Sequence, residues 1–343
     1  MIFFYKLIKK IDIIIWMEVN LNKWHHCQVD KKEFVKLLEK SDISGFKHIF
    51  IFFSSLIVFG YLAFATWGTI WSFIFFFIYG NIYCCSDSIW HETGHKTAFK
   101  SRYWNNFFYE ISSYMNAFEP VRWKWSHFRH HSHTAFEDPL DFEIPIRKPT
   151  DLFFFFTLFI PFGSLLHFKK SLHFETLKHA LGIKSDVMEN CIPENEQSKC
   201  ISSARLHVGI WISLIIISIL TSSWLPVLYF FLPNFYGNTL KACFGLTQHA
   251  GLNENIKDHR FCTRTMTLNP IFSFLYWHME YHIEHHMFPT VPSYNLPKLH
   301  KLLKKQMPPA KKGLWGAYKE IIPALIKQAK DPNYKLEVLV PNP

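Results

Sequence analysis

The stretch WHMEYHIEHHMFP, residues 277–289, decides the fold of this chain because it places three histidines on one side of a predicted helix. His282, His285 and His286 stand at positions i, i+3 and i+4, which share one face of an α-helix. Three imidazoles on one helical face are typical of a metal site, because imidazole is a common metal ligand. We therefore expect further ligands from other parts of the chain to complete this site.

Two earlier segments repeat the pattern. HETGH holds His91 and His95 at i and i+4, and HFRHH holds His127, His130 and His131 at i, i+3 and i+4. Packing explains such clusters poorly, since a group of uncoordinated imidazoles gains nothing for the hydration it loses. The three histidine boxes therefore predict one shared metal centre. His249, in LTQH at the end of the last predicted apolar helix, is a ninth candidate.

The number of histidines bears on the number of metals. One zinc ion takes about four ligands, so eight or nine imidazoles overfill a single site. Two metals with four or five nitrogens each, and with open positions, fit the count. Imidazole suits Fe, Zn, Cu or Ni, and open positions facing a membrane-embedded pocket suggest iron and O2 chemistry on an apolar substrate.

Composition indicates a membrane protein. Aromatic residues make up 18% of the 343 residues and charged residues 19%, below the soluble average of about 25%. The net charge of +10 is not accompanied by an aromatic-interleaved basic motif, so no nucleic-acid partner is expected. Lys and Arg that flank membrane runs instead set topology. The seven cysteines include no C-x-x-C pair, which indicates a reducing compartment.

Two long apolar stretches predict four membrane crossings. A helix needs about 20 apolar residues to span the hydrocarbon, so each stretch is long enough for a hairpin of two helices. The predicted helices are about 48–64, 68–85, 207–221 and 225–245. The expected fold is all-α and integral to the membrane, with two hairpins under a cytosolic helical cap that carries the metal site.

Parity of the crossings determines which side the boxes face. The third box can meet the first two only if residues 134–277 cross the membrane an even number of times. The run 151–168, broken by Pro161 and Gly163, is therefore expected to be interfacial or re-entrant. Because the Lys-rich segments fall on the same side as the boxes, both termini and the metal site are predicted to be cytoplasmic.

The chain is expected to have three parts. Residues 1–45 form an N-terminal cytosolic or interfacial segment, residues 46–305 the membrane domain, and residues 306–343 a C-terminal cytosolic tail.

HETGH, HFRHH and HIEHH, in this order around two hairpins, resemble the integral-membrane fatty acid desaturase and hydroxylase superfamily. The resemblance covers roughly residues 45–305, and the segment YHIEHHMFPTVPSYNLPKLHKL is similar to bacterial fatty acid desaturases. It implies a mushroom-like fold and a cytoplasmic centre of two irons that activates O2. The ligands that it implies are His91, His95, His127, His130, His131, His249, His282, His285 and His286.

The resemblance also implies the reaction and its partners. Two irons and O2 would remove hydrogen from an unactivated C–H bond, and a second hydrogen loss gives a double bond. The favoured function is an acyl-lipid desaturase acting on a membrane lipid. No fused cytochrome b5 segment is visible, so a separate electron donor is expected, either ferredoxin or a cytochrome b5-like carrier. The narrow first box argues against a CoA thioester.

Other activities remain open at this point. Rebound of oxygen onto the substrate radical would make the same site a hydroxylase of a lipid, an alkane or a carotenoid-like substrate. HETGH also satisfies H-E-x-x-H, in which Glu92 would be the general base of a membrane zinc metalloprotease. That reading leaves the second and third boxes without a purpose. Glu92, Glu284 and Asp138 are candidate partners for the ring N–H groups of the ligands, and His133 and His278 are uncertain ligands.

Overall fold

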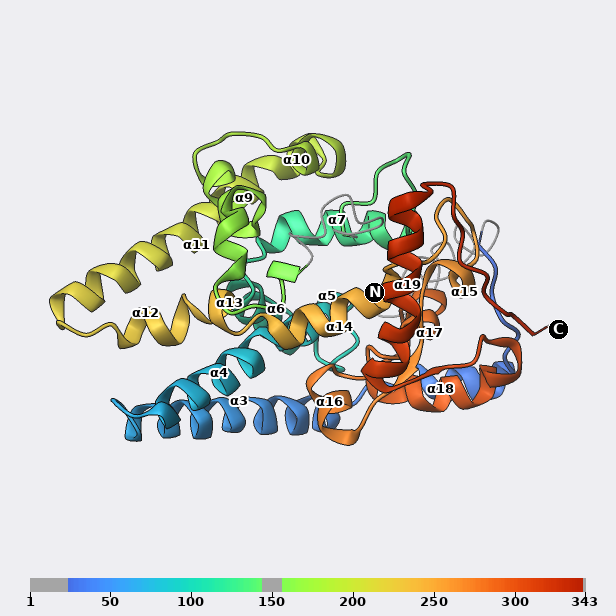
Figure 1. Ribbon diagram of the computed structural model, residues 1–343, viewed down its shortest axis with the longest axis horizontal. Coiled ribbons are helices and arrows are strands. Elements are labelled where there is room, and N and C mark those ends of the chain that lie inside the picture. The colour runs from blue at the N-terminus through green and yellow to red at the C-terminus, as the bar shows by residue number, and fades with distance from the viewer. Residues whose placement is uncertain (1–23, 144–155, 342–343) are drawn as a thin grey trace, which may run out of the picture.

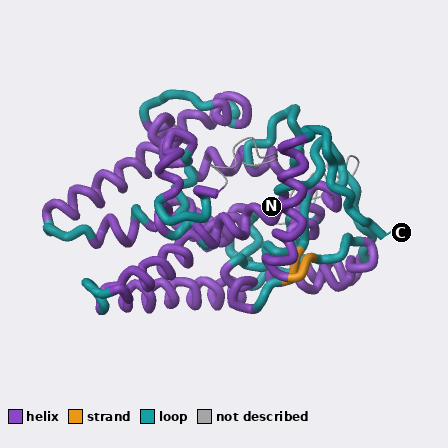
Figure 2. The backbone as a smooth tube through the Cα atoms, viewed as in Figure 1, coloured by secondary structure: helices purple, strands orange, loops and turns teal. Residues whose placement is uncertain are grey.

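The computed structural model describes residues 24–143 and 156–341 of the chain, so the apolar run 1–16 and most of the N-terminal segment lie outside the described residues. The described part is mostly helical, as Figures 1 and 2 show. Each of its strands is two residues long. Its elements are α2 (Lys31–Leu37), α3 (Asp42–Ala65), α4 (Ile70–Cys84), α5 (Ser86–Gly94), α6 (Arg102–Met115), α7 (Pro120–Ser132), η1 (Gly163–Lys170), α9 (Leu172–Ala180), α10 (Asp186–Cys191), α11 (Glu194–Leu220), α12 (Leu225–Phe230), α13 (Pro233–Tyr236), α14 (Thr239–His249), α15 (His259–Cys262), β1 (Met266–Thr267), α16 (Pro270–Leu275), α17 (His282–Met287), η2 (Ser293–Asn295), α18 (Leu296–Leu303), η3 (Lys304–Gln306), β2 (Lys311–Lys312) and α19 (Gly313–Lys330).

The first hairpin is formed by α3 and α4. The Ser41 hydroxyl caps α3 by accepting from the Ser44 amide at 3.2 Å, as expected for an N-cap serine. At the far end, the Ser72 hydroxyl of α4 donates to the Ala63 carbonyl of α3 at 2.8 Å. The two helices lie side by side in Figure 1, in agreement with the predicted pair 48–64 and 68–85.

The second apolar stretch folds differently from its prediction. α11 begins at Glu194, well before the expected start at residue 207, and the stretch 225–245 is divided among α12, α13 and α14. Pro226 and Pro233 each stand in the first turn of a new helix, because proline lacks the N–H that would continue a preceding helix. Figure 1 shows α11 and α12 projecting to the same side of the molecule as α3 and α4.

The end of α13 touches α4 through a glycine contact. A Cβ on Gly237, which follows α13, would lie 2.0 Å from the carbonyl carbon of Gly80 in α4. Any side chain there would force the helices apart. Beside this contact, the Asn81 side-chain oxygen accepts from the Leu240 amide at 2.8 Å and ties α4 to α14.

Three helical segments are long and apolar enough to cross a membrane within the described residues: Asp42–Ala65, Ile70–Gly94 and Glu194–Leu220. Large apolar side chains on them point outward, for example Phe50 at 73% exposure and Phe73 at 74%. Such surfaces suit contact with lipid rather than water. A fourth crossing by α12 to α14 stays a prediction.

The polar residues 169–203 contain α9, α10 and the start of α11. Ser171 and Ser185 cap α9 and α10 by accepting from the amides three residues later. The low apolar content of the segment concealed these helices, whose start signals are the two serines. In the run 151–168, only residues 156–168 are described, and they form turns and most of η1 without a spanning helix.

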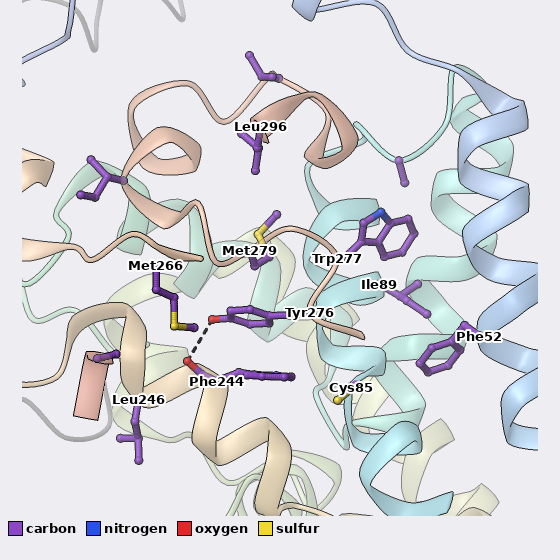
Figure 3. Packing of buried hydrophobic residues seen from close by; sticks show 14 of the residues in the cluster. Phe52, Cys85, Ile89, Phe244, Leu246, Met266, Tyr276, Trp277, Met279 and Leu296 are labelled. Atoms are coloured by element: carbon purple, nitrogen blue, oxygen red, sulfur yellow. Dashed lines mark hydrogen bonds between the residues drawn. The ribbon is translucent and has the colours of Figure 1, made fainter. Parts of the chain in front are cut away.

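The C-terminal part packs against the first hairpin and forms the main core. Trp277 and Met279 are buried with Phe52 of α3 and Ile89 of α5 (Figure 3). The Tyr276 hydroxyl donates to the Phe244 carbonyl of α14 at 3.2 Å, as the dashed line in Figure 3 marks. α19 adds Ala317, Ile321 and Leu325 to the same core, and β2 pairs with β1 in parallel just before it. The segment predicted as a tail thus packs on the domain.

Candidate metal centre

The first box lies at the end of the helix that continues the first hairpin. α5 follows α4 after a single residue, Cys85. His91 is on the last turn of α5, and His95 is its C-cap residue. A Cβ on Gly94 would lie 2.3 Å from the Trp123 ring of α7, so the glycine lets the first two boxes approach closely.

The second box lies on α7. The carboxylate of Glu119 accepts from the Val121 and Arg122 amides at 2.9 and 2.6 Å, and Pro120 occupies the first turn. These are strong helix start signals. They fix the helix on which three histidines share a face and turn towards α5.

The remaining candidate ligands, the third box and His249, are carried by α17 and α14. α17 consists of only His282–Met287, and all three of its histidines are buried. His249 is the last residue of α14. The ring centroids of His91 and His285 are 4.6 Å apart, and those of His130 and His249 are 4.9 Å apart.

The nine predicted ligands converge in two adjacent groups. In each group, one ligand atom from every member lies within 4.8 Å of all the others. The five-histidine group is His91, His95, His127, His131 and His285, and the four-histidine group is His130, His249, His282 and His286. The rings of His131 and His286 stack at 4.5 Å and join the two groups. That these residues bind metal stays a prediction.

The spacing of the ring nitrogens fits a shared ion. The Nε2 atom of His127 lies 2.8 Å from that of His95 and 3.0 Å from that of His131. In the other group, the Nε2 atoms of His286 and His282 are 3.2 Å apart. Two nitrogens bound at right angles at about 2.1 Å from one ion would be about 3.0 Å apart. The observed spacing therefore matches that of neighbouring ligands.

Two carboxylates orient histidines of the second box. Asp141 lies 2.8 Å from Nδ1 of His130, and Glu143 lies 3.1 Å from Nδ1 of His127. A carboxylate at this position accepts the Nδ1 proton and leaves Nε2 with its lone pair directed at the site. Arg122 lies 3.8 Å from Glu143 and pairs with Glu175 at 2.7 Å, which anchors the Glu143 carboxylate in turn.

Two further histidines are oriented by uncharged groups. The Cys262 carbonyl lies 2.9 Å from Nδ1 of His249 and can only accept. The Thr134 hydroxyl donates to the His130 carbonyl at 2.6 Å, so its oxygen is left to accept from Nδ1 of His286 at 3.2 Å. Both contacts again place the unprotonated Nε2 towards the centre.

Burial favours the neutral, metal-binding form in imidazoles of the first, second and third boxes. Burial lowers the pKa of His95 to about 3, with neighbouring His130 acting in the same direction. Burial and the adjacent histidines likewise hold the pKa values of His127 and His285 well below the usual range. Neutral imidazoles in this number fit two metal ions and need no proton loss at neutral pH.

Some histidine partners were missed in the sequence. Asp141 and Glu143 follow the second box at no diagnostic spacing, and Thr134 and the Cys262 carbonyl gave no signal at all. Glu92 instead accepts from the Ser293 amide at 3.0 Å. Glu284 accepts from the Thr265 hydroxyl at 2.6 Å and contacts His300.

Three other residues singled out in the sequence also lie away from the two groups. His133 contacts Ser132, and His278 contacts Ser273 and Glu280. Neither belongs to a histidine group. Asp138 has no contact with a box histidine among the interactions of the described residues.

A cavity of about 260 Å³ opens on both histidine groups. Histidines of both groups line the cavity, and Trp90, Phe118 and Tyr276 add aromatic side chains to its wall. A carbon atom bound there would lie beside both metal positions. The histidines of the cavity wall are His91, His127, His130, His249 and His282.

Comparison with known proteins agrees with the site. A search of curated proteins finds no match. The family model described as fatty acid desaturase matches residues 44–318, which include nearly all of α3, all of α4 and α11, the three histidine boxes and His249. The chain therefore belongs to the fatty acid desaturase family.

Proposed function

We propose that this protein is an O2-dependent desaturase that holds two irons and introduces a double bond into an acyl chain of a membrane lipid. The observation that carries the proposal is the convergence of nine histidines in two adjoining groups beside one cavity. Family membership makes the chain an oxidoreductase of the desaturase kind. The choice of acyl lipid and of desaturation is part of the proposal.

The described residues account for the tasks of the protein in such a reaction. Bound between the boxes, two irons would supply the reduction of O2 and the removal of hydrogen from an unactivated carbon. Asp141, Glu143 and Thr134 keep the ring protons of their histidines directed away from the centre. The aromatic cavity wall excludes water from the carbon that reacts. Electrons would come from a separate carrier, ferredoxin or cytochrome b5-like.

The proposed orientation has the histidine boxes and both termini in the cytoplasm. It requires a fourth crossing by α12 to α14, which would return the chain to the side of the first two boxes. The apolar outward surfaces of α3, α4 and α11 support membrane insertion. Cysteine labelling from the two sides of sealed vesicles would test it. Labelling of a cysteine introduced at Lys36 from the lumenal side would refute the cytoplasmic assignment.

The contacts of Glu92 disfavour the metalloprotease alternative. In an H-E-x-x-H protease, the glutamate activates the zinc-bound water and must face the metal. Here the side chain is fully buried, and one oxygen accepts from the Ser293 amide. Two groups of four and five histidines also exceed what one zinc needs.

The test is product analysis with the purified protein in lipid nanodiscs, iron, a reduced electron donor and O2. We expect an acyl chain with one additional double bond and no product from His285→Ala. Exclusively hydroxylated lipid would establish the hydroxylase alternative instead. Turnover of a non-lipid substrate alone would refute the acyl assignment.

A further inference from the structure

The cavity beside the histidines is lined by two charged side chains that the proposed chemistry does not use. Asp87 and Lys241 line it together with histidines of both groups and Glu143, whose carboxylate already has Arg122 at 3.8 Å as a positive partner. Asp87 is on the first turn of α5, within the segment Ile70–Gly94 that is apolar enough to span a membrane, and Lys241 is on α14. Ionisable side chains in such segments are costly and are a mark of substrate sites.

Lys241 is held in place by groups that leave part of its ammonium group available. Its Nζ atom donates to the Asn116 side-chain oxygen at 3.0 Å and lies 4.8 Å from the centre of the Phe118 ring. Asn116 is itself fixed, because its amide donates to the Ser86 hydroxyl and the Ser112 carbonyl at 2.9 Å each. An ammonium has three N–H donors, so Lys241 can still donate to a molecule in the cavity.

Asp87 determines which kind of molecule is favoured. Its carboxylate accepts from the Ser88 hydroxyl at 3.2 Å and offsets the positive charge of Lys241 in the same cavity. A bound anion would leave this poorly hydrated site with a net negative charge, which is costly. A pure hydrocarbon would leave the donors of Lys241 unsatisfied. An uncharged polar group that accepts a hydrogen bond meets both conditions.

We propose that Lys241, balanced by Asp87, binds an uncharged carbonyl oxygen of the substrate, such as that of an ester or amide. The proposal deepens and rests on the proposed function, since it names the group by which an acyl chain is held. Asp87 precedes His91 by one helical turn, about 6 Å, and Lys241 precedes His249 by about 12 Å along α14. The carbonyl is therefore held one to two helical turns from the oxidised carbon, and Lys241 selects esterified chains over free acids and hydrocarbons.

The experiment measures binding without turnover. The full-length, iron-loaded protein in detergent is kept free of O2 and electron donor, and the dissociation constants of methyl octanoate, octanoate and octane are measured by equilibrium dialysis. We expect the ester to bind at least about tenfold more tightly than octane, as a hydrogen bond to a charged group provides. Equal binding of octane, or tighter binding of octanoate, would overturn the proposal.

Variants isolate the two side chains. Lys241→Met keeps the aliphatic stem and should bring ester binding to the level of octane, whereas Lys241→Arg should retain most of it. Lys199→Met, at a lysine exposed on α11, is the matched control and should bind as the unaltered protein does. Unchanged ester affinity in Lys241→Met would overturn the assignment.

Asp87→Asn tests the charge balance directly. Without the carboxylate, the positive charge of Lys241 is no longer offset, so the preference should shift from the ester towards octanoate. An unchanged preference would contradict the role of Asp87. Because binding is measured separately from oxidation, a protein that shows this pattern but forms no unsaturated product would refute the proposed function alone.

Discussion

The two histidine groups differ in how firmly their members are held. In the four-histidine group, His130, His249 and His286 each present Nδ1 to an acceptor that the fold supplies. In the five-histidine group only His127 does so, through Glu143, in the described part of the chain. The Nδ1 atoms of His91, His131 and His285 are buried and have no partner there.

Because of this difference, one group is preorganised, and the rings of the other would be ordered only by a bound metal. Ligands whose ring orientation is already set lose little freedom when they bind an ion. The five-histidine group has one more ligand but fewer fixed rings. We therefore expect the smaller group to bind its metal with less rearrangement, and the larger group to be ordered by metal binding.

The largest contrast should come from removing one ligand in each group. His130→Ala leaves three ligands and takes the imidazole away from the fully buried Asp141 carboxylate. We expect loss of about one iron per chain, no detectable oxidation and a protein about 3 kcal/mol less stable. His131→Ala leaves four ligands and should retain more iron. Metal analysis measures the iron content of both variants, and thermal unfolding measures their stability. His133→Ala is the control.

Removing the metals should distinguish the groups next. A chelator should lower the stability by about 3 kcal/mol for each iron removed if iron was present at a hundred times its dissociation constant. Because the five-histidine group has few fixed rings, amide hydrogen exchange should rise more in α5 than at the end of α14. Equal increases in amide hydrogen exchange at His91 and His249 would contradict the proposed difference between the groups.

Substituting the two carboxylates that orient histidine rings should weaken iron binding less, and to different degrees. Asp141 has no exposed side-chain surface and serves the four-histidine group, whereas Glu143 is 16% exposed and serves one ring of five. Asp141→Asn should weaken iron binding about 10- to 100-fold, and Glu143→Gln should weaken it less. Iron retained during dialysis against a chelator measures this. Asp138→Asn is the control, and a larger loss in Glu143→Gln would reverse the ranking.

The smallest effect is expected at Thr134. Thr134→Val removes the acceptor for His286 and should cost about 1 kcal/mol of metal affinity, or roughly fivefold. Thr134→Ser keeps the hydroxyl and should bind iron as the unaltered protein does. Competition with a coloured chelator resolves a difference of this size. If Thr134→Ser lost as much iron affinity as Thr134→Val, the methyl group of Thr134 and not its hydroxyl would be responsible.

Much of the fold could be predicted from local sequence patterns. The first hairpin follows from uninterrupted apolar runs, which report membrane helices directly. The division of 225–245 was harder to foresee, because a hydropathy average does not register where Pro226 and Pro233 begin new helices. α9 and α10 were missed because their apolar residues are few and their capping serines are weak signals alone.

The candidate site was likewise predictable only in part. Spacing within each box named the histidines, because the helical repeat places i, i+3 and i+4 on one face. Spacing could not assign them to groups. His130 and His131 are adjacent in sequence, yet they belong to different groups, because consecutive side chains on a helix point about 100° apart. The partners of the rings come from loops and from a backbone carbonyl, whose positions depend on tertiary packing.

The sequence by itself determined that this chain has membrane-length apolar helices and three histidine boxes, since both depend on periodicities of a few residues. Only the tertiary structure decided the rest. It divided nine histidines into groups of five and four, supplied Asp141 and Thr134 as ring partners, and placed Lys241 and Asp87 in the wall of one cavity. These arrangements arise from contacts between residues far apart in the chain, which no local pattern encodes.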